Sequence, residues 1–125
     1  MNALATPILK QRDVLIASLQ PGLTDSDLAI LRDELAESVG TSRARGVILD
    51  VSALDVLDSF AARMLRTIAR TARLRGAKTV IVGIQPDVAF AMVQLGLTFE
   101  DIPTALGLEE GLTRLEGAQG HGAAL

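Results

Sequence analysis

The most informative pattern along the chain is a pair of short, nearly unbroken apolar runs, at residues 46–51 (GVILDV) and 78–84 (KTVIVGI). Each run is too short for an ordinary globular helix, and neither alternates apolar with polar residues as a half-buried strand does. Strands inside a parallel sheet are covered on both faces and show this kind of run. The two segments therefore predict central strands with helices packed on either side.

Apolar residues at three- and four-residue spacing predict the helices. In residues 24–39 the apolar positions repeat in this way, acidic residues stand in the first turn, and Gly40 follows as a stop signal. Further helices are expected over residues 59–75, closed by Gly76, over residues 86–95, opened by Pro86 and stopped by Gly96, and over residues 108–115.

Extended segments complete the element order. Residues 9–19 predict two short strands joined by a tight turn, and residues 102–105 predict a last short strand. The order ββαβαβαβα is typical of one α/β domain, with a mixed and mostly parallel central sheet flanked by about four helices. We expect this domain to span residues 1–116 and the Gly- and Ala-rich segment 117–125 to be a disordered tail.

Composition narrows the chemistry that this domain can perform. The 125 residues fit one compact domain with an aliphatic core. There is no cysteine, and the single histidine is His121, so disulfides, thiol nucleophiles and Cys- or His-rich metal sites are excluded. The net charge is -3, there is no Trp or Tyr, and there are three Phe, which argues against nucleic-acid binding.

Targeting signals and catalytic motifs are missing as well. No apolar run approaches the roughly 18 residues of a membrane span, and the N-terminus lacks the pattern of a signal peptide, so we expect a cytoplasmic protein without a membrane partner. Gly76-Ala77-Lys78-Thr79 is only superficially like the end of a phosphate-binding loop, because the upstream glycine is missing and a strand follows. We expect no enzyme activity, no metal and no cofactor.

Residues 50–65 (DVSALDVLDSFAARML) carry the strongest candidate site. A buried strand ends here, a loop carries Asp55 and Asp58, and Ser59 stands at the start of a helix. Ser and Asp are common helix N-caps, which is a purely structural role. The carboxyl end of a central strand is also where open α/β sheets place their binding sites. Both explanations stay open at this point.

Ser59 heads a stripe of arginines on the predicted helix. At about 100° per residue, the stripe falls within about 80° of the helix circumference and contains Ser59, Arg63, Arg66, Arg70 and Arg73. A charged stripe is usually a solvated helix face. A phosphorylated Ser59, however, would lie near Arg63 and the positive helix end. Phe60 lies between the stripe and the apolar face, where a partly exposed ring would anchor a partner.

An ordered set of short motifs resembles the STAS family, the domain of sulfate transporters and anti-sigma factor antagonists, and within it the RsbS-like scaffold branch. The resemblance runs from about Pro7 to Leu115. Its motifs are Pro7-Ile8-Leu9-Lys10, Asp58-Ser59-Phe60, Gly76-Ala77-Lys78, Gly83-Ile84-Gln85-Pro86, and Thr104-Ala105-Leu106 with Leu108-Glu109. The resemblance implies a single STAS domain.

The same resemblance implies a function. By this resemblance, the chain is expected to be a non-enzymatic scaffold of the bacterial stressosome. Such a scaffold assembles with RsbR-like paralogues, forms homo-oligomers and holds an RsbT-like switch kinase. Stress lets the kinase phosphorylate the serine matched by Ser59, the kinase is released, and an RsbX-like phosphatase restores the serine. The expected partner-binding residues are Asp55, Asp58, Phe60, Arg63 and Arg66.

One departure from the family pattern separates the alternatives. Many antagonists carry a glycine two residues after the phosphorylated serine, whereas this chain has Ala61. This difference favours the scaffold over a direct anti-sigma factor antagonist, which is the main alternative. A small-ligand-binding STAS module is a third hypothesis, with residues 83–87 as its candidate cradle, although Pro86 also suits an ordinary helix start.

Overall fold

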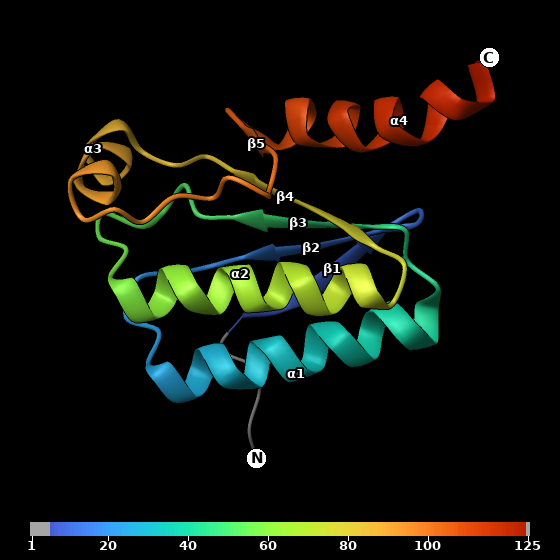
Figure 1. The fold of residues 1–125 in the computed structure, drawn as a ribbon. Coiled ribbons are helices and arrows are strands. Elements are labelled where there is room, and N and C mark those ends of the chain that lie inside the picture. The colour runs from blue at the N-terminus through green and yellow to red at the C-terminus, as the bar shows by residue number, and fades with distance from the viewer. Residues whose placement is uncertain (1–5, 125) are drawn as a thin grey trace.

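The computed structural model describes residues 6–124 of the chain, and the side chains of residues 6–116. These residues form one sheet with helices packed around it (Figure 1). In chain order the elements are β1 Ile8–Gln11, β2 Val14–Ser18, α1 Asp25–Ser42, β3 Gly46–Asp50, α2 Ser59–Leu74, β4 Lys78–Val82, α3 Pro86–Gln94, β5 Thr104–Ala105 and α4 Leu108–Ala124. The observed order matches the predicted one.

The strands lie side by side in their sequence order, β1-β2-β3-β4-β5. β1 pairs antiparallel with β2, and every later pair of neighbours is parallel. The turn between β1 and β2 is tight, with Arg12 in the left-handed region at a φ of 58°. The prediction of an α/β domain with a mixed, mostly parallel sheet is therefore confirmed.

β3 is buried on both faces, as its unbroken apolar run predicts. Val47 and Leu49 pack with α1 and α2, whereas Ile48 packs with α4, and all three side chains are 0% exposed. The neighbouring strand β4 repeats this arrangement, with Ile81 on the first face and Val80 on the second. A one-residue slip would exchange the two faces, so this packing determines the register of the central strands.

The helices divide between the two faces of the sheet. α1 and α2 lie together against one face, and α4 lies against the other (Figure 1). α3 lies at the end of the sheet toward which the parallel strands point. Among the helices of residues 6–124, none has both the length and the apolar character that a membrane crossing requires.

α1 begins where the sequence predicts but ends later. Thr24 Oγ1 accepts a hydrogen bond from the Asp27 N–H at 3.0 Å, and Asp27 Oδ2 accepts one from the Thr24 N–H at 2.9 Å. The prediction that Gly40 stops the helix is wrong, because Arg43 takes the left-handed cap position at a φ of 54°. Gly40 instead leaves room for a guanidinium, since an added Cβ would lie 2.5 Å from Arg75 Nη1.

α4 also extends beyond its predicted end at Leu115. The helix ends at Ala124 and so includes most of segment 117–125. The disorder expected for that segment stays a prediction, and residues 1–5 and 125 lie outside the described part of the chain. Nearer its start, α4 approaches the sheet closely at Gly111, where an added Cβ would lie 2.7 Å from Val82 Cγ1.

Gly83 lets the turn from β4 into α3 pack directly against the connection from β3 to α2. Its φ is +80°, and an added Cβ would lie 2.7 Å from Ser52 Cβ and 3.1 Å from Ser52 Cα. Both the left-handed backbone and the close approach require glycine here.

We expect Gly83→Ala to lower the free energy of unfolding by about 3 kcal/mol, because left-handed strain adds to the overlap with Ser52. Gly96→Ala is the matched control, since Gly96 has a φ of +73° but nothing within 4 Å of an added Cβ. Strain alone should cost the control about 1 kcal/mol. Urea unfolding measures both variants, and equal losses would contradict the close-packing explanation.

Candidate partner-binding site

The connection between β3 and α2 carries the candidate site and is held at its start by local hydrogen bonds. Asp50 Oδ1 accepts a hydrogen bond from the Ser52 N–H at 2.9 Å, and the Leu54 N–H donates to Val51 O at 3.0 Å. The Val51 N–H donates to Val82 O of β4, also at 3.0 Å. An Asp side chain that bonds the backbone two residues later favours such a turn. The loop therefore leaves the sheet in a defined direction.

Asp58, rather than Ser59, is the N-cap of α2. Its backbone is extended, with φ -79° and ψ 175°, and its Oδ1 accepts a hydrogen bond from the Ala61 N–H at 2.8 Å. Ser59 is the first residue of α2 and is exposed. Between described residues, no hydrogen bond involves the Ser59 hydroxyl. A second protein can therefore reach this hydroxyl without disturbing the cap.

The other predicted partner-binding residues surround Ser59 in different environments. Asp55 is exposed, and its Oδ1 lies 3.4 Å from Gln85 Nε2. Phe60 is half-buried and packs against the core, as its place between the two helix faces suggested. Arg63 is exposed one turn after Ser59, whereas Arg66 is half-buried. The structure thus gathers these side chains on one loop and the start of α2.

The arginine stripe faces acidic residues of its own chain, which sequence analysis missed. Arg66, Arg70 and Arg73 line a hollow of about 380 Å³ that is also lined by Glu100 and Asp101. Within the described part of the chain, no ion pair of 4.0 Å or less joins these arginines to these acids. The acidic residues lie far along the chain from α2, so no local sequence pattern could have revealed them.

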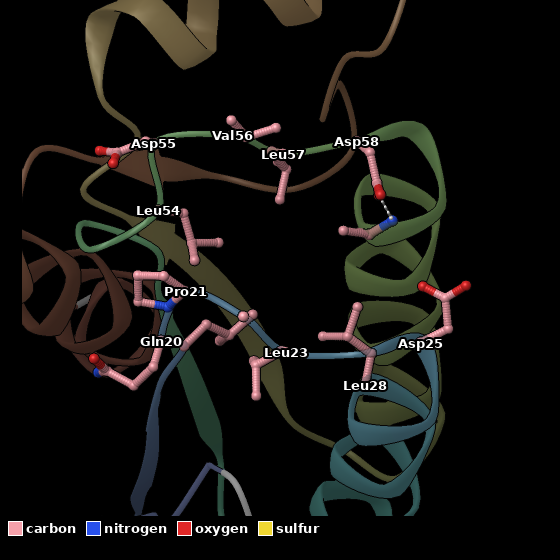
Figure 2. A pocket seen from close by; sticks show the side chains of 13 residues that line it. Gln20, Pro21, Leu23, Asp25, Leu28, Leu54, Asp55, Val56, Leu57 and Asp58 are labelled. Atoms are coloured by element: carbon pink, nitrogen blue, oxygen red, sulfur yellow. Dashed lines mark hydrogen bonds between the residues drawn. The ribbon is translucent and has the colours of Figure 1, made fainter.

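A second hollow, of about 300 Å³, lies beside the cap of α2, between the β2–α1 and β3–α2 connections (Figure 2). Leu28, Leu54 and Leu57 point into it, and Asp25 stands near the start of α1. Val56 points away from the hollow and is 75% exposed. Only the β3–α2 connection was predicted to carry the site. The carboxyl ends of parallel strands meet at one edge of a sheet, which also places the β2–α1 connection there.

The fold and the arrangement of this edge define the class of the protein. The family model described as STAS domain matches residues 6–111, which is most of the chain. The chain therefore belongs to the STAS domain family, as its motifs predicted.

Solved structures narrow the likeness within that family. A serine-to-glutamate variant of RsbS from Moorella thermoacetica is 34% identical, with 92% of this chain and 97% of that chain covered at a TM-score of 0.80. A chain from a structure of the stressosome, described as a signal integration and transduction hub, is 35% identical, with 90% and 98% covered at a TM-score of 0.79. The resemblance to the RsbS-like branch is therefore confirmed.

Among curated proteins, the RsbT co-antagonist protein RsbRA of Bacillus subtilis is 26% identical over 118 residues. The match covers 93% of this chain but 43% of RsbRA, so the chain spans less than half the length of that relative. The motifs implied RsbR-like paralogues as partners, and RsbRA is itself related to this chain in sequence.

We expect Asp58→Ala to lower the free energy of unfolding by about 1 kcal/mol, because the Ala61 N–H loses its acceptor. Ser59→Ala, one residue later, is the matched control and should change stability by less than about 0.5 kcal/mol, as exposed substitutions usually do. Thermal or urea unfolding compares the two. A larger loss in Ser59→Ala would assign the cap to Ser59 instead.

Proposed function

We propose that this chain is a non-enzymatic scaffold subunit of a bacterial stressosome that sequesters an RsbT-like serine/threonine switch kinase and releases it when Ser59 is phosphorylated, thereby regulating a stress response. The observation that carries the proposal is the exposed Ser59 at the first position of α2, next to a cap supplied by Asp58. A kinase can reach the hydroxyl, and the fold does not depend on it. Likeness to RsbS over nearly the whole of both chains supports the scaffold role.

This role implies particular partners. We expect an RsbR-like STAS paralogue in a large complex, an RsbX-like phosphatase that restores Ser59, and self-association into homo-oligomers, all in the cytoplasm. Sequence likeness to RsbRA and structural likeness to a stressosome chain support the assembly. We expect no nucleic-acid or membrane partner, because the net charge is -3. No cofactor is needed, since the ATP belongs to the kinase.

Phosphorylation would change the charge where an acidic loop meets a basic stripe. A phosphoserine carries about -1.5 to -2 charges at pH 7. Beside Asp55 and Asp58, this added charge would repel an acidic partner surface that approaches Arg63, and it would be costly to bury in a closely packed interface. Arg63 and the positive end of α2 would offset part of the charge within the domain. The interface would therefore weaken while the fold persists.

A direct anti-sigma factor antagonist is the second candidate, because an exposed serine at this edge suits it equally. Ala61, at the position of the glycine in many antagonists, favours the scaffold. Size-exclusion chromatography separates the two: a large assembly with an RsbR-like protein supports the scaffold, and a small complex with an anti-sigma factor supports the antagonist. A small-ligand site at residues 83–87 is less favoured, because Gln85 already donates to Ser52 O.

We expect Ser59 to be the main phosphorylation site. The switch kinase and ATP should label the wild type but not Ser59→Ala. Ser52→Ala is the matched control, because Ser52 is exposed in the same connection, and it should be labelled like the wild type. The phosphorylated wild type should lose kinase binding in a titration. Equal labelling of Ser59→Ala, or tight binding by the phosphorylated chain, would contradict the proposed switch.

We expect the double variant Arg63→Glu with Arg66→Glu to associate with the kinase roughly 3- to 10-fold more slowly, because charges at the rim of an interface mainly steer association. Arg45→Glu with Arg114→Glu makes the same charge change at exposed positions just before β3 and on α4, and should leave the rate near wild type. Stopped-flow mixing over a salt series measures both. Identical rates at low salt would mean that the stripe is only a solvated helix face.

A further inference from the structure

Gln85 makes side-chain hydrogen bonds that join two distant segments of the chain. Its Nε2 donates to Ser52 O at 2.8 Å and lies 3.4 Å from Asp55 Oδ1. Every other side-chain hydrogen bond between described residues joins positions no more than four residues apart. Gln85 therefore ties the β4–α3 turn to the loop that leads to Ser59.

The position of Gln85 in its own helix makes this arrangement unusual. Gln85 is the N-cap of α3, with φ -67° and ψ 146°, yet its side chain makes no capping hydrogen bond. Ser, Thr, Asp and Asn are the residues that cap helices well. The side chain instead bonds the neighbouring loop, and α3 begins without a side-chain cap. Departures from a local preference, such as the preference for good capping residues at a helix start, are expected at positions where function selects the residue.

The middle of the β3–α2 loop has few other hydrogen bonds, although Leu57 is buried in the core. Ser52 and Leu54 are bonded near its start, and Asp58 caps α2 at its end. Between these points, residues 55–57 receive one hydrogen bond within the described part of the chain, and it comes from Gln85 to Asp55. The close approach of Gly83 to Ser52 keeps the turn and the loop in contact. Gln85 is thus placed to hold the exposed part of the loop.

We propose that Gln85 is a positioning residue for Ser59, which holds Ser52 and Asp55 so that the loop keeps the conformation offered to the kinase. The kinase step of this inference rests on the proposed function, whereas the restraint of the loop is a property of the chain alone. A restraint of this kind raises the population of the conformation that binds, so it lowers the apparent KM and leaves kcat unchanged.

The test compares Gln85→Ser with Gln94→Ser, which makes the same change at an exposed position at the other end of α3. Serine at position 85 removes the long donor but caps helices well, so the variant should unfold no more easily than the wild type. The hydrogen-bonded amides of Ser52 and Leu54 should exchange about 2- to 10-fold faster, as expected for the loss of one hydrogen bond.

The kinase assay adds a second readout. In Gln85→Ser the KM for phosphorylation of Ser59 should rise about two- to fivefold at unchanged kcat, in proportion to the lost population of the held loop. Gln94→Ser should match the wild type in exchange and in KM. Gln85→Lys keeps a donor at the end of a long side chain, so it should return both quantities toward wild-type values.

Each result decides a different point. Unchanged exchange at Ser52 and Leu54 in Gln85→Ser would overturn the proposal, whatever the kinase does. Faster exchange with a wild-type KM would overturn the positioning role, because the restraint would then not act on Ser59. A wild-type chain that the kinase does not label at Ser59 would refute the proposed function instead, and the exchange rates would still decide whether Gln85 holds the loop.

Discussion

Burial of the central strands on both faces is the constraint on which the rest of the structure depends. Val47 and Leu49 are enclosed by α1 and α2, and Ile48 is enclosed by α4. In β3 and β4, Thr79 is the one buried polar residue, and the charged residues Asp50 and Lys78 stand at strand ends. Parallel pairing brings the β2–α1, β3–α2 and β4–α3 connections to a single edge of the sheet. Under the proposed function, that edge is where the switch kinase would contact Ser59 and the charged side chains around it.

The sequence predicted those features that depend on neighbours along the chain. Apolar runs and helix caps are local, so the element order and the cluster around Ser59 could be predicted before the structure. Gly40 was misjudged because Arg43, a residue type that rarely takes a left-handed conformation, ends the helix instead. The bonds of Gln85 and the acidic wall opposite the arginines could not be predicted, since the fold alone brings those residues together.

The acidic wall also changes how the arginine stripe acts. Glu100 and Asp101 share a hollow with Arg66, Arg70 and Arg73, and exposed charges still act on one another over about 10 Å at 0.1 M salt. Arg63 lies outside that hollow and one turn from Ser59. The acidic wall therefore offsets the far part of the stripe, whereas Asp55 and Asp58 are the acids near Arg63 and Ser59. A phosphate on Ser59 would add to the negative charge of Asp55 and Asp58, and so would weaken the attraction of Arg63 for an acidic partner.

The cap of α2 and the proposed switch residue are different side chains, so a change at Ser59 could alter binding and leave the fold unchanged. If Ser59 were the cap, its hydroxyl would be committed to a backbone N–H, and a kinase would have to break that bond. Asp58 takes this place by accepting from the Ala61 N–H.

A phosphate on Ser59 would be stabilised by the helix end by about 0.3–1 kcal/mol and opposed by the neighbouring Asp58 carboxylate. These contributions are small and opposite in sign, so folding changes little. A partner packed over Ser59 would have to remove water from nearly two added charges without supplying cations for them, which is a far larger cost. Under the proposed switch, the same phosphate would therefore be nearly neutral for the domain and strongly unfavourable for the complex.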